Sequence, residues 1–255
     1  MQRTDASGRE LAIDGAFNVR ELGGLRTAGG GRVAGGLVYR TGDLGGLSRA
    51  GAERLRALGV ATVVDLRRAT EIERHGRYPF EELGIVYRNL PLLDTPAAEP
   101  ETRPAELPPD ILDRLYRRIA DEGGENVGQV LRWFAEPGGL PAVVHCVAGK
   151  DRTGTVIAVL LGLLDVPDDE IVADYALSAP ALVAYRAWAG EHDGTAAAWL
   201  DRVPPVLLQS DPGAMVAFLA WLRERHGSIA AYAASIGVPP AVQDRLRARL
   251  LSAAD

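Results

Sequence analysis

The sequence predicts an α/β fold in which a central, mainly parallel β-sheet is flanked by helices. Two observations support this prediction. Short apolar, partly β-branched runs at residues 37–39, 61–66, 85–92 and 141–144 have the composition of buried strands. Helix-like segments lie between the strands or follow them, and strands spaced by helices form parallel sheets.

In the N-terminal half, local sequence signals predict a tail, a helix and a long loop. Residues 1–14 are polar and are expected to form a loose tail, with a single domain from residue 15 to residue 255. Ser48 is a suitable N-cap for a helix that ends at Gly59. Residues 94–109 are rich in Pro, Ala and Glu and are too long for a simple connection, so we expect this segment to be functional or mobile.

The C-terminal half is dominated by helical patterns. The strand at 141–144 is followed by a largely apolar segment, 155–164, which is typical of a helix packed in the core. Further helices are expected, in chain order, at residues 109–120, 126–136, 167–177, 180–189, 196–203, 212–225, 228–236 and 239–251.

Composition and charge narrow the class of protein. A chain of 255 residues with 47% hydrophobic residues is long enough to bury a sizeable core. The net charge of -6 argues against nucleic acid as a general partner, because a broad basic face is then expected. A single cysteine excludes an intrachain disulfide and suits a reducing cytoplasm. The N-terminus carries no signal-like segment and the apolar run 156–164 is too short to span a bilayer. We therefore expect a cytoplasmic protein without stable membrane insertion, with unconventional secretion left open.

The most informative segment is His145–Gly154, in which five residues separate Cys146 from Arg152 between a strand-like run and a helix-like run. At a helix N-terminus the first N–H groups have no partner within the helix and the macrodipole is positive. The amides of residues 147–152 are therefore suited to hold a phosphate dianion. Arg152 adds a planar fork that pairs two phosphate oxygens, and two glycines allow close approach to an oxyanion. The candidate phosphate-binding residues are Val147, Ala148, Gly149, Lys150, Thr153 and Gly154.

Cys146 is the candidate nucleophile, because the same positive field favours its thiolate form. Thr153 is placed to donate a hydroxyl hydrogen bond to the sulfur, and His145 to orient the strand end from behind. Attack on a phosphate monoester gives a phosphocysteine, which water then hydrolyses. A lone cysteine is more often inert and a lone histidine more often a core residue, but the joint spacing of Cys146, Arg152 and the Thr-Gly pair indicates a phosphatase.

Other interpretations of the loop fit less well. Lys150 is followed by Asp151 rather than by Ser or Thr, and the upstream glycine is missing, so a Walker nucleotide-binding loop is rejected. A sulfurtransferase would use the same thiolate, but Arg152 and Thr153 fit phosphate better, and an arsenate reductase normally needs further cysteines. A phosphate-binding module without turnover is disfavoured because nucleophile and arginine are both intact. The histidines lack metal-ligand spacing, so no metal ion or cofactor is expected.

The run His-Cys-x-x-Gly-Lys-Asp-Arg-x-Gly resembles the signature of the atypical bacterial tyrosine phosphatases. Residues 18–24, 39–44, 65–67 and 171–175 resemble further landmarks of that family, so the resemblance covers most of the chain. It implies a protein-tyrosine-phosphatase-like fold with a helical lid at about residues 170–205, after the catalytic helix. It also implies phosphoprotein substrates carrying phosphotyrosine, with phosphoserine, phosphothreonine or phosphoinositides as further substrates. A dedicated phosphoinositide phosphatase is the alternative.

Departure of the leaving group requires a proton, and two aspartates are candidates for the general acid. Asp94 follows the third strand, where phosphatases with this chain order commonly carry a mobile acid, or it simply starts a polar loop. Asp151 lies inside the cradle, and the family resemblance suggests it as the acid; its alternative role is to brace the loop. We favour Asp151 because an acid in that place lies near the leaving group.

Three further charged residues have open roles. Lys150 adds a cation that suits a second phosphate on an inositol ring, or it is a solvated lysine that raises the local potential. Asp65 and Arg67 follow the second strand at the carboxyl edge, where open parallel sheets place ligand crevices. The resemblance makes these two candidates for the wall of the site, and an ion pair that fastens a loop is the alternative.

Overall fold

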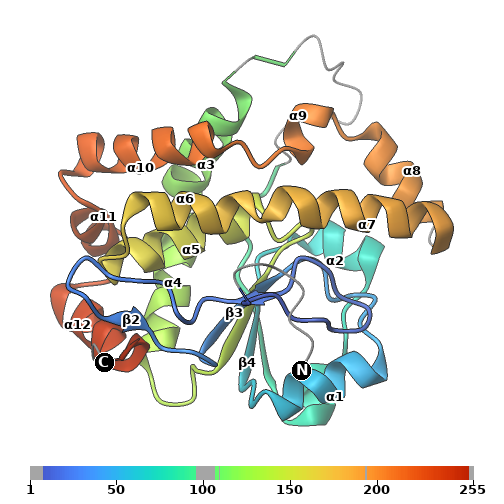
Figure 1. The fold of residues 1–255 in the computed structure, drawn as a ribbon, viewed down its shortest axis with the longest axis horizontal. Helices are drawn as coiled ribbons and strands as arrows, with labels where there is room; N and C mark the ends of the chain where they lie inside the picture. The colour runs from blue at the N-terminus through green and yellow to red at the C-terminus, as the bar shows by residue number, and fades with distance from the viewer. Residues whose placement is uncertain (1–7, 96–106, 109, 193, 253–255) are drawn as a thin grey trace.

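The computed structural model describes residues 8–95, 107–108, 110–192 and 194–252. Its main sheet has five strands in the order β1-β3-β6-β4-β5, where β3, β6, β4 and β5 run parallel and β1 is antiparallel to β3. The predicted α/β fold with helices on both sides of a mainly parallel sheet is confirmed (Figure 1). The strands are β1 (Arg20–Glu21), β3 (Val38–Thr41), β4 (Thr62–Asp65), β5 (Val86–Asn89) and β6 (Ala142–His145).

Alternating side chains of the central strands divide the core into two layers, because successive residues of a strand point to opposite faces. Val63 packs in one layer with Leu55 of the first helix and Phe80 of a 3-10 helix. Val64 packs in the other layer, which the helices of the C-terminal half fill. The helical elements are α1 (Arg49–Ala57), α2 (Ala69–His75), η1 (Phe80–Leu83), α3 (Ile111–Glu122), α4 (Gly124–Ala135), α5 (Asp151–Leu163), α6 (Asp168–Ala176), α7 (Ser178–His192), α8 (Gly194–Arg202), α9 (Pro205–Leu208), α10 (Pro212–His226), α11 (Ile229–Ser235) and α12 (Pro240–Leu250).

Several local predictions are confirmed. Ser48 caps α1, because its side chain accepts a hydrogen bond from the Gly51 amide at 3.0 Å. Gly59 follows the helix with a φ of 75°, in the left-handed region that favours glycine. Helix α5 begins at Asp151, four residues earlier than the apolar pattern predicts, so its first turn belongs to the cysteine loop.

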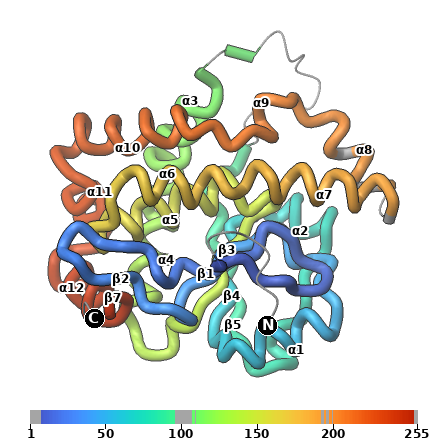
Figure 2. The backbone as a smooth tube through the Cα atoms, viewed as in Figure 1, coloured from blue at the N-terminus to red at the C-terminus, as the bar shows by residue number. Residues whose placement is uncertain are grey.

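Two short strands and one short helix carry no sequence pattern that predicts them. Strands β2 (Arg32–Val33) and β7 (Leu251–Ser252) form a separate antiparallel pair beside α12 (Figure 2). Elements of two residues are too short to show a hydrophobic period. Helix α2 has no buried residue, so it also lacks an apolar stripe.

Residues 8–14 are packed, and the prediction of a loose tail is wrong for this part. Leu11 and Ile13 are buried, and the Leu11 amide donates to the Val19 carbonyl at 3.0 Å. The Arg9 guanidinium lies 2.7 Å from the carboxylate of Asp174. A few apolar residues and one arginine therefore anchor a segment that is polar on average. Residues 1–7, like most of the predicted loop at 94–109, lie outside the described residues.

Candidate active site

The cysteine loop joins β6 to α5, in the middle of the sheet and at the N-terminus of a helix. Cys146 is only 2% exposed. Its neighbours Val147, Asp151 and Arg152 line a cleft of about 1520 Å³. The structure therefore places the predicted nucleophile next to residues that line a large cleft, at a helix N-terminus where the helix dipole favours an anion.

The backbone of the loop requires glycine at position 149. Its φ is 63°, and a Cβ atom on it would lie 2.3 Å from the Thr41 carbonyl oxygen at the end of β3. Gly154 has a different role from the one predicted. It lies within α5, where a Cβ atom would meet the ring of Tyr175 at 3.2 Å, so its contact is with a helix rather than with an oxyanion.

The loop backbone is held from outside by hydrogen bonds to its carbonyl groups. The Asn18 amide donates to the carbonyls of Ala148 and Gly149 at 2.9 and 3.2 Å. Arg40 Nη2 donates to the Gly149 carbonyl at 2.9 Å, and the Asp43 amide donates to the Val147 carbonyl at 2.9 Å. Since these carbonyls face away from the centre of the loop, the N–H groups of the same peptide units face inward.

Arg152 is held by a carboxylate that the sequence analysis did not identify. Glu71 of α2 accepts hydrogen bonds from Arg152 Nη1 and Nη2 at 2.6 and 3.0 Å, and the Leu66 carbonyl accepts a further one at 3.3 Å. Burial opposes the charge of Glu71, but the adjacent Arg152 guanidinium prevails and lowers the pKa of this carboxyl to about 2. Among the described residues, these contacts leave the Nε–H and one N–H of Nη2 of Arg152 for phosphate oxygens.

Asp151 lines the cleft through a side chain that is 22% exposed. Its Oδ1 accepts a hydrogen bond from the Tyr116 hydroxyl at 2.9 Å, and Tyr116 is itself hydrogen-bonded to Tyr175. Burial, with help from Asp151, keeps the pKa of Tyr116 well above its usual value, so the phenol stays protonated and acts as a donor. The pair of tyrosines therefore orients Asp151 toward the cleft and beside Cys146.

Lys150 is buried and is not a solvated lysine, so that alternative is wrong. Its side chain is 0% exposed, and Nζ lies 2.5 Å from Asp151 Oδ1. An ammonium group without water needs such a partner. The contact gives Asp151 its bracing role in addition to its position in the cleft.

Asp94 lies apart from the loop. It is exposed at the beginning of the connection after β5, and it is not among the residues that line the cleft, although Leu93 and Thr95 on either side are. Of the two candidate acids, Asp151 lines the cleft together with Arg152, and Asp94 does not.

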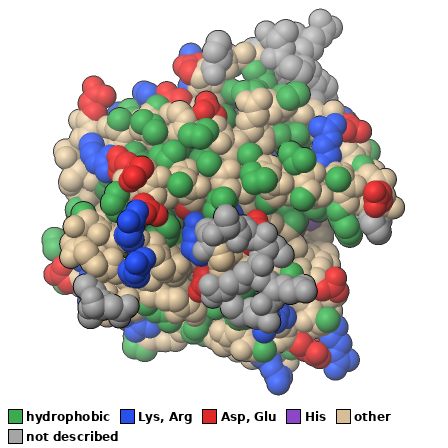
Figure 3. All heavy atoms as spheres, in the orientation of Figure 1, with side chains coloured by type: hydrophobic (Ala, Val, Ile, Leu, Met, Phe, Trp, Pro, Cys, Tyr) green, Lys and Arg blue, Asp and Glu red, His purple; other side chains and the backbone are tan. Residues whose placement is uncertain are grey.

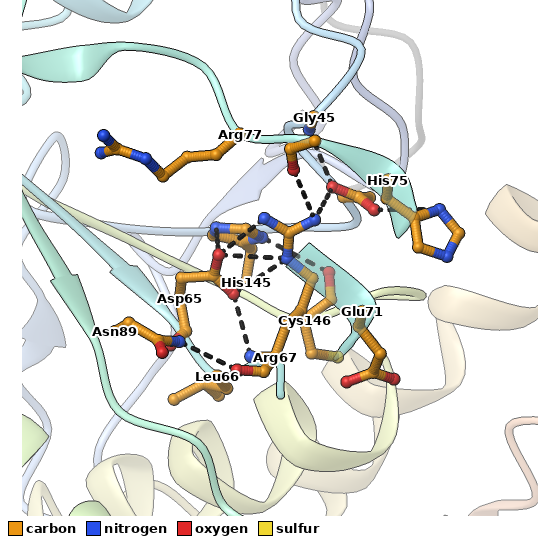
Figure 4. A network of polar contacts seen from close by, with 12 residues as sticks. Gly45, Asp65, Leu66, Arg67, Glu71, His75, Arg77, Asn89, His145 and Cys146 are labelled. Carbon is orange, nitrogen blue, oxygen red and sulfur yellow. Dashed lines mark hydrogen bonds and ion pairs between the residues drawn. The ribbon is translucent and has the colours of Figure 1, made fainter. Parts of the chain in front are cut away.

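Asp65 and Arg67 form an ion pair that fastens a loop, which is the second of the two roles considered for them. Both are buried, and Arg67 Nη2 donates to Asp65 at 2.7 Å while Arg67 Nη1 donates to Asp43 at 2.7 Å (Figure 4). His145 Nε2 lies 3.6 Å from the same Asp65 carboxylate, and Nδ1 lies 3.4 Å from the Cys146 carbonyl oxygen. Burial lowers the pKa of His145, so its ring is neutral at pH 7. This network lies beneath Cys146 and supports the strand ends instead of forming a wall of the cleft.

The predicted hydrogen bond from Thr153 to the sulfur is not formed. The Thr153 hydroxyl is buried and has no hydrogen-bond partner among the described residues. Thr153 lies in the first turn of α5, where the other threonine, Thr155, donates instead to the Asp151 carbonyl at 3.0 Å.

Helix α7 covers the open side of the cleft, which Ala181, Ala184, Tyr185 and Trp188 line in part. The Tyr185 ring stacks on Phe17 with centroids 3.7 Å apart and planes 8° apart. Residues 170–205, the segment that resembles a lid, are largely helical and include α7 and α8.

The described residues contain neither a metal-binding cluster nor a membrane-spanning helix. Within the described residues, no cluster of three or more His, Cys, Asp and Glu side chains has a geometry that could hold a metal ion. No helix in the described part of the chain is both long enough and apolar enough to cross a membrane.

Comparison with known proteins agrees with the geometry of the loop. The mycobacterial (Mycobacterium tuberculosis, strain H37Rv) triple specificity protein phosphatase PtpB is 31% identical over 203 residues, which are 69% of this chain and 71% of PtpB. A Cupriavidus necator protein provisionally named as a tyrosine-protein phosphatase is 35% identical over 172 residues. The match covers 65% of this chain and 62% of that relative, so the chain spans under two thirds of its length.

Among solved structures, the crystal structure of P. aeruginosa TpbA matches with a TM-score of 0.35 and 15% sequence identity, over 81% of this chain and 90% of TpbA. The model of the tyrosine phosphatase family matches residues 11–252, which is nearly the whole chain and includes every residue of the cysteine loop. The chain therefore belongs to the tyrosine phosphatase family.

Proposed function

We propose that this protein is a cysteine-dependent phosphatase that hydrolyses phosphotyrosine through a phosphocysteine intermediate. The observation that carries the proposal is the position of Cys146 under inward-facing amides at the start of α5, with Arg152 fixed beside it by Glu71. A phosphate monoester in this cradle has its phosphorus atom next to the thiolate. Water and reduced cysteine are the only requirements of this route, which suits the cytoplasm.

The reaction has two steps. The Cys146 thiolate attacks phosphorus, the S–P bond forms and the P–O bond to the tyrosine breaks, while the amides and Arg152 hold the equatorial oxygens. In our proposal Asp151 protonates the departing phenoxide, because it lies in the cleft between the loop and α3. Water then attacks the phosphorus atom of the phosphocysteine and Asp151 accepts its proton. The S–P bond breaks, so the Cys146 thiolate is restored and phosphate leaves.

The range of substrates is part of the proposal. PtpB is named for triple specificity, and a cleft of about 1520 Å³ has room for more than one phosphorylated side chain. Lys150 is paired with Asp151 and is not among the residues that line the cleft. We therefore rank phosphotyrosine above phosphoserine, phosphothreonine and phosphoinositides.

The test is phosphate release by the wild type and by Cys146→Ser from phosphotyrosine, phosphoserine and phosphothreonine peptides and from phosphoinositides, with a chelator present. We expect the wild type to act on phosphotyrosine peptide and the variant to lose about 10³-fold or more in kcat. Ser235→Ala, a change on helix α11, is the control and should keep full activity. Turnover that survives Cys146→Ser would overturn the thiolate mechanism, and a preference for phosphoinositides would replace the proposed substrate class.

A further inference from the structure

Inward-facing amides in the cysteine loop depend on donors that hold its carbonyl groups outward. A peptide unit points its C=O and its N–H in opposite directions, so holding the carbonyls of Ala148 and Gly149 outward turns the next two N–H groups into the cradle. Two side chains supply these donors. They are Asn18, which follows the packed N-terminal segment, and Arg40 of β3.

Both donors are connected to a single buried carboxylate on α6, far away in the sequence. Asp174 Oδ2 lies 2.6 Å from Arg40 Nη1, and Asp174 Oδ1 lies 3.2 Å from Arg20 Nε. Arg20 Nη1 in turn donates to Asn18 Oδ1 at 2.5 Å, which fixes the amide of Asn18 so that its NH2 group faces the loop. Asp174 is therefore connected to the loop by two routes. One runs through Arg40 alone, and the other runs through Arg20 and then Asn18.

Electrostatics make this carboxylate necessary. Arg20, Arg40 and Asp174 are each about 1% exposed. Burial and the neighbouring Arg40 charge lower the pKa of Arg20 to about 10, which shows that the two guanidinium groups repel each other. Attraction to the arginines outweighs burial and holds the pKa of Asp174 far below its ordinary value. Arg9 also lies 2.7 Å from the Asp174 carboxylate, so three arginines surround one carboxylate. Net positive charge therefore remains beside the Gly149 carbonyl, to which Arg40 donates.

We propose that Asp174 is a positioning residue for the phosphate cradle: through Arg20, Arg40 and Asn18 it fixes the direction of the loop amides, and it holds the two arginines in place behind them. Asp174 touches no reacting atom. This inference rests on the proposed function, since it assigns the cradle to an oxyanion. It predicts that a change at Asp174 weakens binding of the oxyanion and not only the stability of the fold.

The first experiment uses Asp174→Asn, which keeps the shape of the side chain and removes its charge. Calorimetry with tungstate as the oxyanion probe measures binding, and phosphate release from a phosphotyrosine peptide measures turnover. We expect the dissociation constant for tungstate to rise about tenfold or more, with a matching rise in KM. A role confined to stability would lower the melting temperature and the active fraction, and it would leave the dissociation constant unchanged.

Two further variants separate the outcomes. Asn18→Gly tests the path directly, because glycine tolerates the φ of 58° at this position and lacks the donor amide; it should weaken tungstate binding even where Asp174→Asn fails to fold. Gln243→Met is the control, since Gln243 of α12 is also buried and donates hydrogen bonds to the carbonyls of Ala230 on α11 and of Val238 between the two helices, away from the loop. It should lower stability and leave tungstate binding unchanged.

The inference is overturned where folded Asp174→Asn and Asn18→Gly bind tungstate like the wild type, or where Gln243→Met weakens binding as much as they do. If the wild type binds tungstate but releases no phosphate, only the proposed function is contradicted. The role of Asp174 is then still tested by the tungstate dissociation constant of Asp174→Asn. Wild type that binds no oxyanion contradicts both.

Discussion

At the scale of single residues, our proposal for the general acid is tested by comparing Asp151 with Asp94. Asp151 faces the cleft with its carboxylate held by Tyr116, while Asp94 is exposed and outside the lining of the cleft. Asp151→Asn should therefore lower kcat about 10²-fold or more for phosphotyrosine, whose phenoxide needs a proton. Asp94→Asn should change kcat less than about twofold. The measurement is kcat for each variant over a range of pH.

An aryl phosphate with a strongly acidic phenol provides the internal control for this prediction. Its leaving group departs without a proton, so Asp151→Asn should lose much less activity on it than on phosphotyrosine. Equal losses on both substrates would assign Asp151 the bracing role alone, and a large loss in Asp94→Asn would move the acid to the loop after β5.

The cysteine loop could be predicted because all of its reactive and phosphate-binding residues lie in one run of ten residues, 145–154. The residues that position the loop could not be predicted, because they are polar side chains from distant elements and no sequence motif connects them. Glu71 lies on an exposed helix without an apolar stripe, and Tyr116 has the spacing of a core residue. Asp174 and Arg40 belong to segments that resemble family landmarks, yet only the fold shows that they meet.

At the scale of elements, we predict that access to Cys146 depends on α7. Its Tyr185 stacks on Phe17 across the cleft, and the open face of the same helix exposes Val183, which is 71% accessible. Hydrophobic side chains are spread over the face formed by α6, α7 and α10 (Figure 3). The stacked pair should therefore contribute to keeping the cleft covered.

Tyr185→Ala tests this role of α7. Loss of the stacked ring should raise the rate of alkylation of Cys146 by iodoacetamide about threefold to tenfold, because an aromatic pair contributes about 1 kcal/mol beyond its buried area. Val183→Ala on the same helix is the control and should leave the alkylation rate unchanged. An unchanged rate in Tyr185→Ala would show that α7 does not limit access to the thiol.

Helices and strands could be predicted where packing against the core imposes a periodic pattern of apolar residues on the sequence. The buried strands β3, β4 and β6 and the amphipathic helix α3 follow apolar patterns, whereas β1, β2, β7 and α2 arise from pairing and capping that leave no period in the sequence. The packed segment 8–14 was missed for a related reason: a polar average conceals Leu11 and Ile13, which alternate along an extended chain.

At the scale of the whole molecule, the charges that build the site also make its stability depend on pH. The pKa of Glu71 is about 2 in the folded protein against an ordinary value of 4.5. The pKa of Asp65 is lowered by His145 and then by Arg67, and that of Asp174 is lowered by its arginine partners, each against the opposing effect of burial. A carboxyl whose pKa is lower in the folded state stabilises the fold above its unfolded pKa, and this contribution is lost as the pH falls toward the folded pKa. The free energy of unfolding should thus decrease steeply below pH 4.5.

Glu71→Gln isolates one part of this dependence. The lowered pKa of Glu71 corresponds to about 3 kcal/mol of stability at pH 7, so the variant should be less stable than the wild type by roughly that amount at neutral pH. The difference should shrink between pH 4.5 and pH 2, because the wild-type carboxyl is then protonated as well. Urea unfolding at several pH values measures it. Glu53→Gln removes an exposed ion pair with Arg49 and should change stability by less than about 1 kcal/mol; a Glu71→Gln difference that persists undiminished at pH 2 would show that the Arg152 ion pair is not its cause.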